Sequence, residues 1–180
     1  MDKQTARNQQ IATLKAYPDS QREAETKQIV QKLTAMPEWQ AAQSIATTVS
    51  GPFEFDTAGV IAAAQAAGKT VYLPKVMPKR QMAFMQHPGA DNLIRSSFGL
   101  LEPAYNESTL NNQPDLVIVP GLAYALDSHK RLGFGGGYYD RFLAHYHGTS
   151  IALALPIQVF TSAFWPEEQF DVALQHILTI

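Results

Sequence analysis

The sequence contains no cysteine among its 180 residues. A disulfide framework, a thiolate zinc site, an iron–sulfur cluster and a cysteine nucleophile are therefore excluded. An excess of charge of one sign is also missing, because the formal net charge is only -2 at pH 7. Nothing in the bulk composition therefore points to nucleic acid or an anionic membrane surface. A phosphate ligand would have to be attracted by local cations and backbone N–H groups.

Long apolar runs are absent as well. No stretch approaches the roughly 18 residues that a membrane span requires, and the opening MDKQTARNQQ is followed by no apolar segment of the secretory type. We therefore expect no membrane partner and a cytoplasmic location. The length suits one domain with a substantial core, and we expect a monomer or a weak homodimer.

The pattern of apolar residues predicts a single α/β domain over residues 1–180. Two helices are expected in the polar first part of the chain, the second capped by Asp19 or Ser20. A strand at Ser44–Ser50 precedes an alanine-rich helix at Thr57–Ala67, which Asp56 is expected to cap. Together with the strand at Thr70–Leu73 these elements form a βαβ unit, which implies a parallel sheet.

The rest of the chain continues this alternation. A helix is expected at Tyr138–Tyr146, and the segment 87–113 is mainly loop. Four further strands are predicted, at Gln81–Gln86, Asp115–Val119, Ser150–Leu155 and His176–Ile180. The expected fold is an open α/β sandwich, with a mostly parallel central sheet flanked by helices on both faces.

The most informative segment is RLGFGGGYYDR, from Arg131 to Arg141. Its glycines follow a strand and a loop and directly precede a helix, so their backbone N–H groups can converge on an anion beside the positive end of the helix. Arg131 and Arg141 flank the loop and add full positive charge. Asp140 is well placed to hold a Mg2+ ion that bridges phosphate oxygens.

Two common nucleotide loops do not fit this spacing. A Walker A loop needs Lys and then Ser or Thr after its last glycine, whereas Tyr138 and Tyr139 follow Gly137. A dinucleotide fingerprint needs glycine where Tyr138 stands. The alternative is that the segment binds no ligand and is only a flexible glycine-rich connector that caps a helix. The two tyrosines, the aspartate and the flanking arginines favour an anion site instead.

RLGFGGGYYDR resembles the R-L-G-x-G-x-G-Y-Y-D-R motif of the 5-formyltetrahydrofolate cyclo-ligase family, whose members are also called methenyltetrahydrofolate synthetases. The resemblance extends over essentially the whole chain. Three segments support it: DLVIVPGLAY at Asp115–Tyr124, FGLLEP at Phe98–Pro103 and LPKV at Leu73–Val76. It implies a ligase that uses ATP and Mg2+ to convert 5-formyltetrahydrofolate into 5,10-methenyltetrahydrofolate.

The resemblance also implies roles for individual residues. The family's N-terminal K-x-x-x-R, which contacts nucleotide phosphate, matches Lys3 and Arg7; without the resemblance, these two residues would be assigned to a solvated helix face. The rest of the nucleotide site would be Arg131, Leu132, Gly133, Phe134, Gly135, Gly136, Gly137, Tyr138 and Tyr139. Asp140 and Asp171 would hold the metal, although Phe170 and Gln175 depart from the family's pattern around Asp171.

The folate site implied by the resemblance centres on Glu54, whose carboxylate can accept two N–H bonds from a pterin edge. Val49 lies nearby on the strand end, and the glycine-rich loop would complete the site through Phe134, Gly135, Gly136, Gly137 and Tyr138. Arg131, Tyr138 and Asp140 would carry the catalysis, while we expect Arg141 to support the loop.

Two other classes of protein remain open on the sequence alone. One is a different α/β enzyme whose loop binds the phosphate of a sugar phosphate or of an acyl carrier, since a fold does not determine a function. The other is a folate- or nucleotide-binding module without catalysis, which is motivated by the departures at Phe170 and in the loop Ala125–Lys130.

Overall fold

The computed structural model describes residues Met1 to Ile180. The N-terminal segment forms α1 (Lys3–Ala16) and α2 (Asp19–Ala35), followed by the short α3 (Pro37–Ala41). Asp2 caps α1 by accepting a hydrogen bond from the backbone N–H of Thr5. The predicted cap of α2 is wrong, because the helix already begins at Asp19, with Pro18 in the cap position and no side chain bound there.

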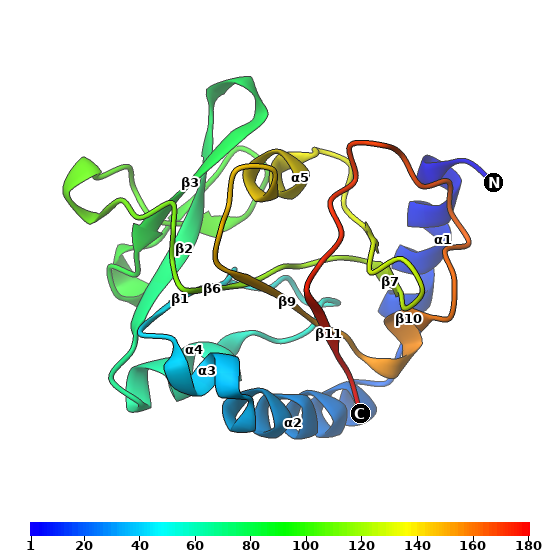
Figure 1. The fold of residues 1–180 in the computed structure, drawn as a ribbon, viewed down its shortest axis with the longest axis horizontal. Helices are drawn as coiled ribbons and strands as arrows, with labels where there is room; N and C mark the ends of the chain where they lie inside the picture. Colours follow the sequence, from blue (N-terminus) through cyan, green and yellow to red (C-terminus); the bar gives the residue numbers. More distant parts are fainter.

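A six-stranded sheet forms the centre of the molecule, with the strand order β11-β9-β6-β1-β2-β3 (Figure 1). Its strands are β1 (Ser44–Ala46), β2 (Thr70–Met77), β3 (Gln81–Gln86), β6 (Leu116–Ile118), β9 (Thr149–Leu153) and β11 (His176–Leu178). All neighbouring pairs are parallel except the β2–β3 hairpin. The helix α4 (Ala58–Ala66) connects β1 to the parallel β2, so the predicted βαβ unit and the predicted fold class are confirmed.

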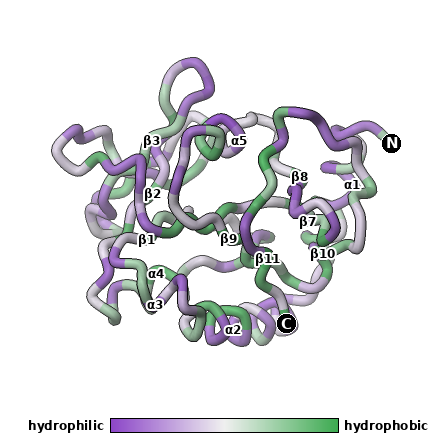
Figure 2. The backbone as a smooth tube through the Cα atoms, viewed as in Figure 1, coloured by the Kyte–Doolittle hydropathy of each residue, from purple (hydrophilic) through white to green (hydrophobic).

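Alternating side chains of the parallel strands face two helical layers. One face of the sheet packs against α2, α3 and α4, and the other packs against α5 (Tyr138–Leu143). Figure 2 shows hydrophobic residues along the central strands and hydrophilic ones on the outer loops. The first layer is centred on Ile29, Leu33, Trp39, Ile45, Val60, Leu116 and Ile151, and the second on Ala46, Phe84, Val117, Leu143 and Ala152.

Several predicted boundaries differ from the structure. The strand predicted to run to Ser50 ends at Ala46, because the chain then turns back and the Thr57 hydroxyl donates a hydrogen bond to the Thr48 carbonyl at 2.6 Å. Thr57, not Asp56, occupies the cap position of α4, although the Asp56 carboxylate accepts a hydrogen bond from the N–H of Ala58. The helix α5 ends at Leu143 rather than Tyr146, because tighter i→i−3 bonds follow it.

A second, small sheet was not predicted. It has the order β10-β7-β8 and consists of β7 (Ala123–Ala125), β8 (Arg131–Leu132) and β10 (Val159–Phe160). It packs with α1 around Leu14, Leu122, Leu132 and Trp165.

The predicted loop at 87–113 carries a short hairpin of β4 (Ile94–Arg95) and β5 (Leu101–Glu102). The helices of the molecule are all too short or too polar to cross a membrane. Four 3-10 turns complete the chain, at Pro78–Arg80, Ala90–Asn92, Glu107–Thr109 and Pro156–Gln158.

Candidate active site

A large cavity of about 1250 Å³ opens beside the carboxyl ends of β1 and β6. Ligands of open α/β sheets commonly bind at this edge. The cavity lies between the β2–β3 hairpin, α5, the glycine-rich loop, the first turns of α1 and the segment 168–172. The predicted site residues that line it are Lys3, Arg7, Val49, Glu54, Arg131, Gly133, Phe134, Gly135, Gly136, Gly137, Tyr138, Tyr139, Asp140 and Asp171.

Leu132 is the one predicted site residue that does not line the cavity. It lies on β8, where side chains alternate in direction, and its side chain is completely buried in the cluster beneath α1. The side chain of Leu132 therefore has a packing role, and its predicted part in the nucleotide site would rest on its backbone.

The glycine-rich loop connects β8 to α5 and offers a row of free backbone donors. None of the N–H groups of residues 133–137 donates to another group of the protein. The loop carbonyls, in contrast, are held from outside by two arginines: Arg7 Nε donates to the Gly133 carbonyl at 2.9 Å, and Arg141 Nη1 donates to the Gly136 carbonyl at 3.1 Å. Free N–H groups beside the start of a helix form an anion-binding loop.

Two glycines of this loop have backbone conformations that side chains rarely adopt, with φ of +109° at Gly135 and +70° at Gly137. Gly136 is required for a different reason. A Cβ atom added there would lie 2.5 Å from the ring of Tyr138. The position of this ring against the loop therefore depends on a residue without a side chain.

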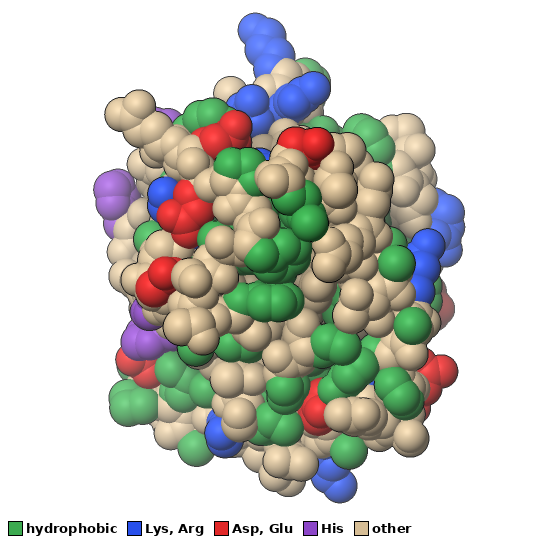
Figure 3. Space-filling model, turned by 90° about the vertical axis from the view of Figure 1, so that its right-hand side faces the viewer, with side chains coloured by type: hydrophobic (Ala, Val, Ile, Leu, Met, Phe, Trp, Pro, Cys, Tyr) green, Lys and Arg blue, Asp and Glu red, His purple; other side chains and the backbone are tan.

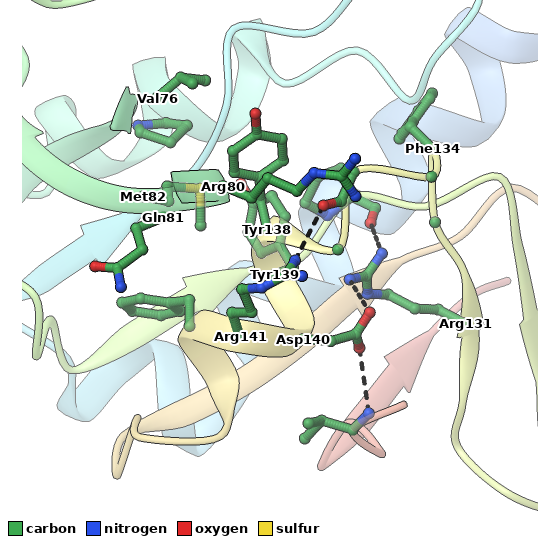
Figure 4. Close-up of a pocket in the computed structure, with 18 of the residues that line it drawn as sticks. Val76, Arg80, Gln81, Met82, Arg131, Phe134, Tyr138, Tyr139, Asp140 and Arg141 are labelled. Atoms are coloured by element: carbon green, nitrogen blue, oxygen red, sulfur yellow. Dashed lines mark hydrogen bonds and ion pairs between the residues drawn. The ribbon is translucent and has the colours of Figure 1, made fainter. Parts of the chain in front are cut away.

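Arg131 is held in place by three groups. Its Nη2 donates to Asp140 Oδ2 at 3.3 Å, its Nη1 donates to the Pro120 carbonyl at 3.4 Å, and its guanidinium lies over the Tyr139 ring (Figure 4). Its side chain is only 5% exposed, so little motion is left to it. An arginine fixed in this way is preorganised to bind an anion.

The two predicted metal ligands lie close together. Asp140 Oδ1 accepts a hydrogen bond from the N–H of Val172, the residue after Asp171. Both oxygens of Asp171 lie 2.8 Å from Lys3 Nζ, and Glu168 Oε2 lies 2.5 Å from the same ammonium group. The chain nowhere gathers three or more acidic or histidine side chains into a metal cage. Two carboxylates completed by phosphate oxygens and water fit Mg2+, which is commonly bound with its nucleotide in this way.

Glu54 also lines the cavity, and its carboxylate accepts a hydrogen bond from the N–H of Gly51 at 3.0 Å. Burial raises the pKa of this carboxyl, and the bond from Gly51 offsets the rise only in part. A Cβ atom at Gly51 would lie 2.8 Å from Glu54 Oε1, so a larger residue there would displace the carboxylate. A partly desolvated carboxylate favours a ligand that brings N–H donors.

Tyr139 borders the same region. Burial raises the pKa of its phenol, so the phenol stays protonated across the ordinary pH range. Its hydroxyl is buried and has no hydrogen-bond partner in the protein. A buried polar group without a partner is uncommon, and here it borders the cavity that Tyr139 lines.

Other residues lining the cavity carry little signal in the sequence. The β2–β3 hairpin contributes Pro74, Val76 and Met82, and the β4–β5 hairpin contributes Phe98 and Leu100. The two hairpins are joined by Glu102, whose carboxylate accepts bonds from Lys75 Nζ at 2.5 Å and from the N–H of Val76 at 3.2 Å. The segments LPKV and FGLLEP therefore meet at this ion pair, and their shared resemblance to one family was the signal available in the sequence.

Comparison with known proteins agrees with this geometry. The family model for the 5-formyltetrahydrofolate cyclo-ligase family matches residues 1–180. The chain belongs to this family. A 5-formyltetrahydrofolate cyclo-ligase of Haemophilus influenzae is 30% identical over 175 residues, covering 86% of this chain and 93% of the relative. One of Escherichia coli is 28% identical over 169 residues, covering 90% of this chain and 91% of the relative.

Solved structures extend the agreement to three dimensions. A 5,10-methenyltetrahydrofolate synthetase of Aquifex aeolicus superposes with a TM-score of 0.84 at 26% identity, covering 99% of this chain and 90% of the other. One of Mycoplasma pneumoniae gives a TM-score of 0.75 at 21% identity, covering 99% of both chains, which supports the fold alone. The predicted membership of the cyclo-ligase family is thus confirmed.

Proposed function

We propose that this protein uses ATP and Mg2+ to convert 5-formyltetrahydrofolate into 5,10-methenyltetrahydrofolate, with release of ADP and phosphate. The observation that carries the proposal is the joining of two sites in one cavity. The glycine-rich loop presents free N–H groups suited to phosphate, and Glu54 presents a partly buried carboxylate suited to a pterin. Membership of the cyclo-ligase family supports the same reaction.

The chemistry demands positioning more than a protein nucleophile. The formyl oxygen is amide-like and a poor leaving group. Transfer of the γ-phosphoryl group of ATP to this oxygen breaks the bond to ADP and forms a phosphate ester. N10 then attacks the formyl carbon and the ring closes, phosphate leaves with the formyl oxygen, and the proton of N10 is released to the phosphate or to water. Such a transfer is accelerated by alignment and charge neutralisation.

The nucleotide phosphates would be bound by the N–H groups of residues 133–137, with Arg131 as the fixed cation beside them. Lys3 and Arg7 reach the same cavity from α1 and would add positive charge. Arg141 supports the loop through the Gly136 carbonyl. Because Arg7 also binds a loop carbonyl, it can join the phosphates to the loop that cradles them.

Asp140 and Asp171 would hold Mg2+ together with phosphate oxygens. A bound Mg2+ ion would neutralise charge that develops on the phosphate oxygens during transfer. Asp140 keeps Arg131 oriented in addition, and Asp171 keeps Lys3 near the phosphates. Each of the two acids would thus contact both the metal ion and one basic residue, Arg131 in the case of Asp140 and Lys3 in the case of Asp171.

The pterin would bind through its N–H edge to Glu54, with Val49 beside it on the strand end. Phe134 and Tyr138 would cover the reacting part of the folate from the loop. Phe134 is 46% exposed, and burial under a bound folate would remove this apolar surface from water. Folate and nucleotide would then meet at the glycine-rich loop, which both require.

The test is the near-ultraviolet absorbance of the methenyl product. The protein with 5-formyltetrahydrofolate, ATP and Mg2+ should give a rise in absorbance that is absent when ATP or Mg2+ is omitted. No rise under full conditions would refute the proposal. Calorimetric binding of folate and ATP without product would then indicate a binding module, and binding of neither would indicate a different α/β enzyme.

A further inference from the structure

Arg80 is the one lysine or arginine of the cavity whose side chain has no partner in the protein. Five lysine and arginine side chains line the cavity: Lys3, Arg7, Arg80, Arg131 and Arg141. Four of them donate hydrogen bonds to carboxylates or carbonyls. The side chain of Arg80 forms neither a hydrogen bond nor an ion pair with another group of the protein. An unpaired arginine facing a cavity is available to an anionic ligand.

The position of Arg80 is also conformationally costly. Lys79 and Arg80 form the tip of the β2–β3 hairpin, where Met77 pairs with Gln81, and their φ angles are 60° and 56°. Residues other than glycine rarely adopt this left-handed conformation. It is maintained here at Lys79 and at its neighbour Arg80, and of the two only Arg80 lines the cavity. Figure 2 shows this tip as a hydrophilic end of the hairpin, and Figure 3 shows Lys and Arg side chains projecting at the same level of the molecule.

An apolar path leads from the deep part of the cavity to Arg80. Pro74 and Val76 line the cavity from alternate positions of β2, and Met82 lies opposite Val76 on β3. From Pro74 to Met77 the strand advances about 10 Å, at roughly 3.3 Å per residue. Glu54 follows the carboxyl end of β1, where the Thr47 N–H donates to the Tyr72 carbonyl two residues before Pro74, and Arg80 lies at the other end of the path, at the hairpin tip.

The order of Glu54, the apolar path and Arg80 matches the three parts of a folate. The pterin of a folate carries N–H donors, the aminobenzoyl group is flat and largely apolar, and the glutamate carries carboxylates. We propose that Arg80 binds these terminal carboxylates and so selects folates that carry a glutamate. The inference rests on the proposed function, because it takes the pterin to bind at Glu54.

The nucleotide is the other source of anionic groups, and the cavity favours the folate. The free N–H groups of the glycine-rich loop, together with Lys3 and Arg7, surround the end of the cavity next to α1. Arg80 comes from the hairpin, beside Gln81 and Met82, and its side chain extends from there toward Tyr138 (Figure 4). A phosphate bound by the loop already has several donors, whereas a carboxylate at the hairpin has only Arg80 as a cationic partner on the cavity wall.

The experiment compares two substrates in the Arg80→Gln variant. One is 5-formyltetrahydrofolate, and the other is the corresponding tetrahydropteroate, which lacks the glutamate. We expect KM for the folate to rise about tenfold, as for loss of a hydrogen bond to a charged group. KM for the tail-less substrate and KM for ATP should not change, and Arg80→Lys should restore part of the affinity. Lys79→Gln is the matched control, because it removes the same charge from the same turn at a side chain that does not line the cavity.

Three outcomes would overturn the inference. An equal rise in KM for both substrates would mean that Arg80 acts on the hairpin and not on the tail. A rise in KM for ATP would assign Arg80 to the phosphates. An equal rise in KM for the folate in the Lys79→Gln variant would mean that Arg80 only attracts anions through its charge and does not bind the carboxylates directly. Methenyl product formed by the unaltered protein shows in each case that the proposed function stands.

Discussion

Asp140 accepts a hydrogen bond from the Arg131 guanidinium with one carboxylate oxygen and from the N–H of Val172 with the other. One side chain thereby connects the glycine-rich loop to the segment that carries Asp171. The proposed metal ligand is also the group that orients the fixed cation of the phosphate site. Substitutions at Asp140 should therefore act on the proposed metal site and on Arg131 together.

We predict that Asp140→Asn lowers kcat by about 100-fold or more, the size of effect seen when one preorganised charged contact is removed. The amide can still accept the bond from Arg131, so the fold should persist. Stopped-flow absorbance of the product measures kcat, and circular dichroism with a thermal melt checks the fold. A rise in the Mg2+ concentration needed for half-maximal rate should accompany the loss. Full activity in this variant would refute the metal assignment.

The second prediction concerns Glu54→Gln. The amide cannot accept two N–H bonds as a carboxylate does, so KM for the folate should rise at least tenfold with KM for ATP unchanged. A parallel rise in both constants would contradict a folate-specific role for Glu54. Isothermal titration of each ligand separates this binding effect from turnover.

The same variant should change how stability depends on pH. Burial raises the pKa of Glu54 in the folded protein above its unfolded value, so the folded state holds the proton more tightly. The stability that this provides is fully present below the unfolded pKa and is lost as pH rises through the folded pKa. Glu54→Gln abolishes this loss, so its Tm relative to the unaltered protein should increase over that range. A difference in Tm that is independent of pH would contradict the assignment.

Lys3 should contribute to stability as well as to ATP binding. Its partner Asp171 has a side chain that is only 6% exposed, and Lys3→Gln would leave this carboxylate without its cation. We expect a loss of about 2 kcal/mol, below the range for a fully buried pair because Lys3 is partly exposed. Denaturant unfolding measures it. The double variant with Asp171→Asn should recover much of the loss, and strictly additive effects would show that the pair does not interact.

Gly136→Ala tests the position of Tyr138. The added Cβ would lie 2.5 Å from the tyrosine ring, so the ring must move away from the loop. We expect kcat/KM for the folate to fall by about 10- to 100-fold, because a small misplacement near the reacting groups is costly. The control is Gly59→Ala in α4, where the new Cβ would lie 3.6 Å from Val30. That variant should keep full activity and gain about 0.5 kcal/mol, because alanine restricts the unfolded chain more than glycine does. Equal activity in both variants would contradict the role of Gly136.

Sequence patterns predicted the parts of the structure that have a local physical signal. The buried strand near Val117, the helix after Asp56 and the glycine-rich loop each follow from periodicity, capping residues or glycine content. The small sheet was missed because its strands of two or three residues are too short to show a period. Because β8 was not predicted, the sequence also did not indicate that the side chain of Leu132 points away from the cavity and into the cluster beneath α1.

The site was predicted by motif and completed by contacts distant in the chain. Lys3 and Asp171 were placed in one site by family resemblance, but their pairing joins residues 168 positions apart and has no trace in local sequence. Arg80 was missed because a basic residue in a hairpin turn is ordinary in sequence. Arg80 stands out only in the structure, because the other four lysine and arginine side chains of the cavity donate hydrogen bonds to groups of the protein.

The pairing of Lys3 with Asp171 has a consequence for synthesis of the protein. The first helix emerges from the ribosome long before the residues that hold its ammonium group, and the glycine-rich loop emerges between the two. Contacts of such high sequence separation form late, after most of the chain has been ordered. A nascent chain in which Asp171 has not yet emerged would therefore present an incomplete form of the proposed phosphate site, and stabilisation by ATP is expected only after that residue has emerged.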